Sequence, residues 1–185
     1  MKKTTLYFSL LMIACSVLLS ILPSCVKDNS SEPGVEKVRP GDMLPEFSVV
    51  MNDGSKVSDK DLKGYVSVIV FFHTLCPDCR QELPVVQKVY ERYAADDVKF
   101  IAISREEGTE SVSEYWSENG IALPFSAQKD RRVYELFSTR GVPRIYIADR
   151  EGTVRYVHSD VDMPSYEVLQ DEIEDVETYV VSKTL

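Results

Sequence analysis

The sequence predicts an α/β sandwich with a mixed central sheet, and three observations support that prediction. Two apolar, β-branched segments, 65–72 and 98–104, have the pattern of strands buried on both faces of a sheet. Each is followed by residues of helical periodicity, which is the order expected for crossovers between parallel strands. The segments 144–149 and 153–159 are also strand-like, and the "REG" between them is typical of a hairpin.

The elements are expected in the order β-α-β-α-α-β-β-α. The domain begins near "GDMLPEF", and "DGSKVS", 53–58, indicates a turn that leads into a short strand. After the strand at 65–72, the apolar residues recur at helical spacing from Pro77 onward, so a helix should start there.

Three further helices complete the prediction. The first spans 108–120, with Thr109 or Ser111 as its N-cap and Gly120 at its end, and the second spans 130–141. The last is an amphipathic helix that packs on the sheet through one apolar stripe. The stripe consists of Tyr166, Leu169, Ile173, Val176 and Val180.

The N-terminal residues have the pattern of a targeting segment. "MKK" is followed by an apolar run at 6–22 and then by "PSC", which is typical of a secretory signal, although the run is long enough to leave an uncleaved membrane anchor open. "LPSC" resembles the lipobox of bacterial lipoproteins, so Cys25 is expected to carry lipid; a lone exposed thiol is the alternative. The predicted organisation is a signal peptide at 1–24, a lipidated cysteine and flexible linker at 25–39, and one domain at 40–185.

The overall charge narrows the range of partners. The formal net charge is −9, and removal of residues 1–24, which carry two lysines and no acid, would take it to −11. An acidic surface argues against nucleic acid and against electrostatic docking on anionic lipid.

The stretch "FFHTLCPDCRQELP", 71–84, carries the candidate chemistry. It would place Cys76 at the N-terminus of a helix, where free backbone N–H groups and the helix dipole favour a thiolate. Pro77 suits the first helical turn, and Cys79 lies three residues further on the same face. A structural disulfide is one alternative, and zinc is another, although His73 and His158 are the only histidines available.

The same stretch resembles the active-site segment of the TlpA/ResA family of membrane-anchored thiol-disulfide oxidoreductases, within the AhpC/TSA–redoxin superfamily. "GDMLPEF" resembles the family's entry into the domain, and "GVPRIYIADREG", 141–152, resembles its cis-proline loop, strand and turn. The resemblance covers roughly residues 40–182. It implies a thioredoxin-like fold with an inserted strand-helix unit at about 98–120.

The resemblance also assigns roles to single residues. Cys76 matches the attacking thiolate and Cys79 the resolving thiol, while Pro143 matches a cis-proline and Val142 the backbone that pairs with substrate. Glu82 matches an acid that handles the proton of the resolving thiol, unless it lies on a solvated helix face.

Residues around the two cysteines are expected to modify the site. Pro77 and Asp78 are assigned to the substrate-binding surface, and the charge of Asp78 should oppose thiolate formation and favour a reducing couple. Phe72 and Leu75 replace tryptophans that are common in the family. His73 replaces a small residue, and it either tunes the thiolate or forms part of the wall.

The predicted function is reduction of protein disulfides by dithiol exchange in the cell envelope, without a metal or an organic cofactor. The redox-active centre would be a Cys76–Cys79 disulfide, re-reduced by a membrane electron donor. A monomer is expected, anchored by lipid and facing the periplasm, with the cell surface as an alternative because "VKDN" after Cys25 resembles export signals. Two other functions remain open: a peroxiredoxin-like thiol peroxidase and a redox-inert binding lipoprotein.

Overall fold

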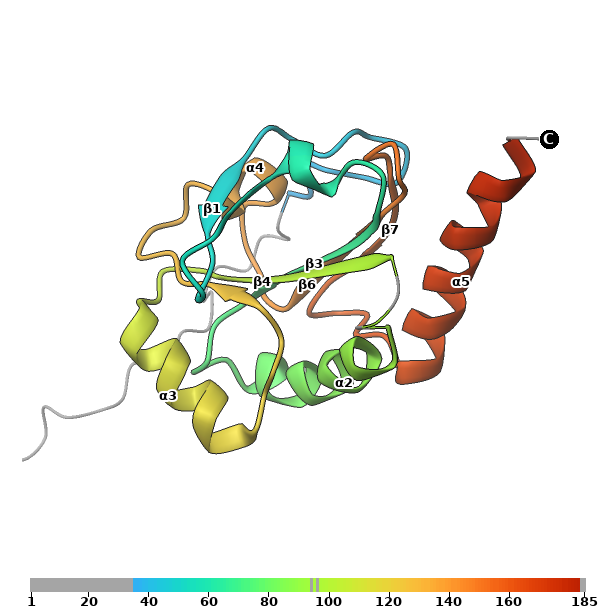
Figure 1. Ribbon diagram of the computed structural model, residues 1–185. Helices are drawn as coiled ribbons and strands as arrows, with labels where there is room; N and C mark the ends of the chain where they lie inside the picture. Colours follow the sequence, from blue (N-terminus) through green and yellow to red (C-terminus); the bar gives the residue numbers. More distant parts are fainter. Residues whose placement is uncertain (1–34, 94, 96, 184–185) are drawn as a thin grey trace, which may run out of the picture.

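The computed structural model describes residues 35–93, 95 and 97–183 (Figure 1). The predicted signal peptide and the lipidation of Cys25 therefore lie outside the described residues. None of the helices that the structure does describe is long and apolar enough to span a membrane.

A five-stranded mixed sheet forms the centre, with the strand order β5-β4-β3-β6-β7. The strands β3 (Val66–Phe72) and β4 (Val98–Ser104) are parallel, and β5 (Phe125–Ser126) extends the parallel part. The strands β6 (Arg144–Ala148) and β7 (Val154–His158) form an antiparallel hairpin beside β3. The predicted mixed sheet and its four longer strands are thus confirmed.

Helices cover both faces of this sheet (Figure 1). The helices α2 (Pro77–Tyr93), α3 (Thr109–Asn119) and α5 (Tyr166–Lys183) follow β3, β4 and β7 along the chain. In the view of Figure 1, α2 and α3 lie below the sheet, whereas α4 (Tyr134–Phe137) and β1 (Ser48–Val50) lie above it.

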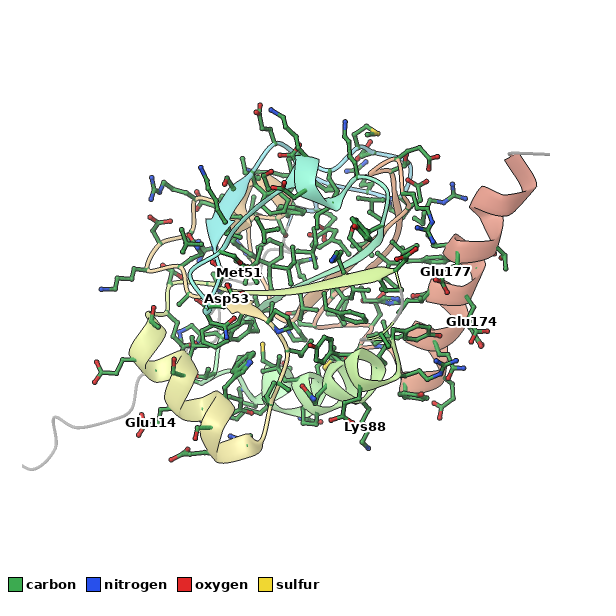
Figure 2. All side chains as sticks on the ribbon, in the orientation of Figure 1. Met51, Asp53, Lys88, Glu114, Glu174 and Glu177 are labelled. Carbon is green, nitrogen blue, oxygen red and sulfur yellow. The ribbon has the colours of Figure 1, made fainter. Side chains whose placement is uncertain are left out.

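The strand β2 (Lys56–Ser58) pairs with β1 in a small antiparallel hairpin, and η1 (Asp59–Leu62), a short 3-10 helix, follows it. The short strand expected from "DGSKVS", 53–58, is therefore present. The charged side chains of Lys88 on α2 and Glu114 on α3 point away from the sheet, while apolar side chains fill the space between the layers (Figure 2).

The core explains why β3 sits in the middle of the sheet. All seven residues of β3 are buried, as the pattern of this segment predicted. Phe71 packs on one face against Phe137 and Tyr146, with ring centroids 4.9 and 6.0 Å away, and Phe72 packs on the other face against Trp116 at 4.7 Å. Burying each such side chain contributes roughly 1.5–3 kcal/mol, so the strand that leads into the cysteine motif is firmly held.

Two helix predictions were wrong in detail. The N-cap of α3 is Gly108, without a side-chain cap, and neither Thr109 nor Ser111 takes that position, although Gly120 does end the helix in a left-handed conformation. The helix expected over 130–141 is limited to α4.

That shortening has a structural reason. Ser138 is extended, with φ −154° and ψ 166°, and it forms a β-bridge with Glu36. The chain then leaves the helical path through Thr139, whose N–H donates to the carbonyl of Val35 at 3.1 Å, so a tertiary contact replaces the last helical turns.

Residues 35–39, which belong to the expected linker, contact the domain. The N–H groups of Lys37 and Val38 both donate to the carbonyl of Phe137. The carboxylate of Glu36 pairs with the buried guanidinium of Arg144 and accepts a hydrogen bond from a tyrosine hydroxyl of β6. The end of the linker is therefore fixed next to the start of β6.

Candidate active site

The two motif cysteines lie where β3 ends and α2 begins. Cys76 directly precedes the helix and is 6% exposed, whereas Cys79 in the first turn is fully buried. Both are free thiols, and a hydrogen bond connects them. The carbonyl of Cys76 accepts the N–H of Arg80 at 3.1 Å, so Cys76 takes part in the first helical turn.

The turn before Cys76 is fixed by buried hydrogen bonds. The carbonyl of His73 accepts the N–H of Cys76 at 3.0 Å, and the Nδ1 atom of His73 accepts the N–H of Leu75 at 3.1 Å. The carboxylate of Glu107 accepts the N–H of Thr74 at 2.9 Å and also its hydroxyl. These hydrogen bonds fix the sharp turn that places Cys76 at the N-terminus of α2.

The environment of Cys76 favours its thiolate. Its pKa is lowered to about 6, first because the Cys79 thiol donates a hydrogen bond to it, and also because the backbone N–H groups of Asp78 and Cys79 point at it. Burial and the Asp78 carboxylate act in the opposite direction. The lowering of the Cys76 pKa expected from the helix N-terminus and the opposing rise expected from Asp78 are both present.

Cys79 behaves in the opposite way. Burial raises the pKa of its thiol well above the ordinary range, and the hydrogen bond to Cys76 raises it further. The pair is therefore asymmetric, with one sulfur ready to be an anion and the other holding its proton.

The loop before β6 brings a backbone carbonyl to the first sulfur. The Val142–Pro143 peptide bond is cis, as the resemblance implied. The Cys76 thiol donates to the carbonyl of Val142 at 3.2 Å. Gly141 has a φ of +83°, a conformation that favours glycine, and its carbonyl accepts the hydroxyl of Tyr134 at 2.7 Å.

Glu82 is buried beneath the pair and does not lie on a solvated helix face. It is 3% exposed and lies three residues after Cys79 on the same side of α2. Its Oε1 atom has no hydrogen-bond partner among the described residues. Burial raises the pKa of Glu82 to about 7, and the positive charge of His158 counteracts that rise.

The residues around the two sulfurs differ in how far they are exposed to solvent. Pro77 is exposed, Asp78 is half-buried, and Leu75 is 51% exposed, so these residues surround the buried sulfurs at the surface. His73 is instead a buried residue of the wall. Burial lowers the pKa of His73, against the opposing charge of Glu107, whose carboxylate is 3.7 Å away.

Three residues that change the pKa values of site residues were not predicted as part of the site: Arg105, Glu107 and His158. The guanidinium of Arg105 is 1% exposed, and its charge lowers the pKa values of His73 and Cys79. Arg105 and Glu107 directly follow β4, which is the parallel neighbour of β3. The carboxyl ends of parallel strands lie at the same edge of a sheet. The position of Arg105 and Glu107 just after a predicted strand could therefore have indicated that they lie close to the cysteines.

No group of three or more His, Cys, Asp or Glu side chains among the described residues is arranged to hold a metal ion.

Residues 40–157 match the family model described as "AhpC/TSA family". The chain belongs to the AhpC/TSA family. Within this family, it is 27% identical over 157 residues to the thiol-disulfide oxidoreductase ResA of Bacillus thuringiensis (strain Al Hakam), a match that covers 83% of this chain and 87% of the relative. ResA of Bacillus subtilis (strain 168) is 24% identical over 156 residues, covering 83% and 84%.

Solved structures of similar proteins have the same fold. A thiol:disulfide interchange protein of the thioredoxin family from Chlorobium tepidum TLS has a TM-score of 0.65 and 28% identity, covering 75% of this chain and 97% of that one. A thio-disulfide isomerase from Thermus thermophilus has a TM-score of 0.62, with the same identity and coverage. This member of the AhpC/TSA family thus has a thioredoxin-like fold.

Proposed function

We propose that this protein is a thiol-disulfide oxidoreductase that reduces disulfides of other proteins in the cell envelope. The observation that carries the proposal is the asymmetry of the two thiols: the pKa of Cys76 is lowered to about 6, whereas that of the buried Cys79 is raised. Such a pair suits an attacking thiolate with a resolving thiol behind it. The likeness to ResA proteins supports the same chemistry.

The first step uses Cys76. Its thiolate attacks one sulfur of a substrate disulfide, so that a bond forms between Cys76 and that sulfur while the other substrate sulfur leaves as a thiolate. The main chain of Val142, 3.2 Å from the Cys76 sulfur, would pair with an extended segment of the substrate and orient the disulfide. Pro143, Pro77 and Asp78 would form the surface against which that segment lies.

The second step uses Cys79. Its thiol gives a proton to Glu82, and the resulting thiolate attacks the Cys76 sulfur of the mixed disulfide. A Cys76–Cys79 disulfide forms, and the bond to the substrate breaks. The substrate leaves with two electrons more than it had, and a donor dithiol must re-reduce the protein.

Reduction of insulin disulfides tests this function, with dithiothreitol as the donor. The wild-type protein should accelerate precipitation of the insulin B chain, and Cys76→Ser should abolish that acceleration. Cys79→Ser should accumulate a mixed disulfide. Peroxide consumption without insulin reduction would instead indicate the peroxidase, and inactivity in both assays would indicate a binding protein.

The reducing direction is a separate part of the proposal. The Asp78 carboxylate opposes the thiolate at Cys76, and a less stable thiolate makes the dithiol a stronger reductant. A reduction potential measured against glutathione should lie nearer to that of thioredoxin, about −270 mV, than to that of DsbA, about −120 mV. A value near the latter would contradict this direction.

Membrane anchoring through lipid on Cys25, after removal of residues 1–24, completes the proposal. It would hold the domain of residues 40–185 in the envelope, facing the periplasm, near a membrane electron donor. Metabolic labelling with a radioactive fatty acid should mark the wild-type protein, and Cys25→Ser should remove the label. Equal labelling of both proteins would contradict the assignment.

A further inference from the structure

The last residues of the predicted linker run beside the segment that leads to the loop of residues 140–144 (the Val142 loop). The N–H of Val35 donates to the hydroxyl of Thr139 at 2.9 Å, and the carbonyl of Val35 accepts the N–H of Thr139 at 3.1 Å. Glu36 is the next residue of the linker, so its side chain begins close to the Val142 loop.

The side chain of Arg144 connects Glu36 to both ends of the Val142 loop. Arg144 is the last residue of the loop, and its Nε and Nη2 atoms donate to the carbonyl of Arg140, the first residue, at 3.0 and 2.6 Å. Its Nη1 atom donates to the carboxylate of Glu36. One guanidinium therefore joins the two ends of the loop, and a carboxylate of the linker holds that guanidinium.

The ion pair of Glu36 and Arg144 is largely removed from solvent. The side chain of Arg144 is 6% exposed, and that of Glu36 is 23% exposed. The other carboxylate oxygen of Glu36 accepts the hydroxyl of Tyr146, so both oxygens have a partner. Because a guanidinium is planar and its donors are fixed in direction, it can hold a carboxylate and a carbonyl together in one orientation. The orientation of Arg144 thus depends on Glu36.

The Val142 loop is the part of the site that would orient a substrate. The carbonyl of Val142 is 3.2 Å from the Cys76 sulfur. The carbonyl of Gly141, directly before it, accepts the hydroxyl of Tyr134 at 2.7 Å. Side chains therefore hold the carbonyls of both residues that precede Val142, and one of these side chains is oriented by Glu36.

We propose that Glu36 is a positioning residue for substrate binding: through Arg144, it holds the Val142 loop where the main chain of Val142 can pair with a substrate beside Cys76. Glu36 acts only through Arg144 and takes part in no bond-making step. The inference rests on the proposed function, because the pairing of Val142 with substrate belongs to that function. It also makes the end of the linker a contributor to the site.

Steady-state reduction of insulin by the full-length protein, with dithiothreitol as the donor, tests the proposal. In Glu36→Ala, the guanidinium of Arg144 loses its carboxylate partner and the loop is held less firmly. The KM for insulin should therefore rise by about tenfold, while kcat stays nearly unchanged.

A small reagent separates loop position from thiol reactivity. Alkylation of Cys76 by iodoacetamide near pH 9, where this thiol is ionised, needs no pairing with the loop. Glu36→Ala should thus react with iodoacetamide at the wild-type rate. A slower reaction would show that the substitution disturbs the thiol itself, and it would overturn the proposal.

Three further variants test whether Glu36 acts through Arg144. Arg144→Lys keeps a positive charge, but its single ammonium cannot reproduce the planar set of donors, so its KM should rise to a similar extent. The double variant Glu36→Ala/Arg144→Lys should be no worse than the worse single variant, because both changes break the same connection. Lys37→Ala is the matched control: it truncates the neighbouring residue, whose Nζ donates to the carbonyl of Glu135 at 2.6 Å, and it should keep the wild-type KM.

Four results would contradict this role of Glu36. They are a wild-type KM in Glu36→Ala, a wild-type KM in Arg144→Lys, a rise in KM that Lys37→Ala reproduces, and single effects that multiply in the double variant.

A failure of the proposed function would look different. A wild-type protein that does not reduce insulin would contradict that function, whereas NMR of the backbone amides of Gly141 and Val142 still tests the positioning. These amide signals should shift in Glu36→Ala and stay in place in Lys37→Ala. Unshifted signals in Glu36→Ala would overturn the proposal by themselves.

Discussion

Replacing Glu82 by Gln should stabilise the folded protein in mild alkali and should give no gain in stability in mild acid. Glu82 is 3% exposed, and burial raises its pKa from an ordinary 4.5 to about 7. Between these two values the folded protein holds a proton that the unfolded chain has already released. The free energy of unfolding therefore falls as the pH rises from about 4.5 to about 7.

The size of the effect follows from the difference between the two pKa values. At about 1.4 kcal/mol per pH unit, the ionised Glu82 costs the folded state up to roughly 3 kcal/mol above pH 7. Gln removes this cost but leaves an amide with a hydrogen-bonding deficit of about 1–2 kcal/mol. The variant should thus be more stable than wild type by about 1–2 kcal/mol near pH 8, and it should show no gain near pH 5.

Urea unfolding followed by circular dichroism, at both pH values, measures this difference. Glu118→Gln on the exposed surface of α3 is the matched control and should change stability at neither pH. The same Glu82→Gln protein should resolve mixed disulfides slowly, because the amide cannot accept the proton of Cys79. Equal stability of wild type and variant across the whole pH range would refute the account of a buried carboxyl whose pKa is raised to about 7.

Two other substitutions examine the electrostatics and the backbone of the site. Asp78→Asn removes a carboxylate that raises the pKa of Cys76, so the ultraviolet titration of that thiolate should move to lower pH; a move to higher pH would show that Asp78 acts otherwise. Gly141→Ala places a Cβ atom 2.7 Å from a carboxylate oxygen of Asp160 at a φ of +83°, and it should destabilise the protein by more than about 1 kcal/mol in urea unfolding. Gly54→Ala, at a φ of +85° with open space around it, is the control for backbone strain alone, and an equal loss in both variants would exclude a contribution from Asp160.

Much of the fold could be predicted because its central elements have strong local signals. The segment 98–104 is strand β4 with the same bounds, and 65–72 differs from β3 by one residue. Both are rich in β-branched and aromatic residues and lack a regular polar alternation, which favours a strand buried on both faces. The cysteine motif could be located for a similar reason, since Pro77 and the change of periodicity mark a helix start.

The parts of the fold that could not be predicted depend on contacts between distant parts of the chain. The helix expected over 130–141 ends early because Glu36, about a hundred residues away, pairs with Ser138. The strand β5 has two residues and exists only through its pairing with β4. Neither feature leaves a local pattern that periodicity could reveal.

The charged residues around the thiols could not be predicted either, because they too come from distant parts of the chain. Glu107 accepts the N–H of Thr74 from the loop after β4, and the charge of His158, at the end of β7, lowers the pKa of Glu82 on α2. A sequence pattern shows which side chains could ionise, but the folded structure determines which of them share a buried space.

The central claim is that Cys76 is a thiolate at neutral pH while Cys79 retains its proton. Titration of the reduced protein by thiolate absorbance, with Cys76→Ser as the control, measures this claim most directly. The account predicts one transition with a pKa of about 6, which disappears in the control. A first transition at about 8.5, the value of an ordinary cysteine, would contradict it.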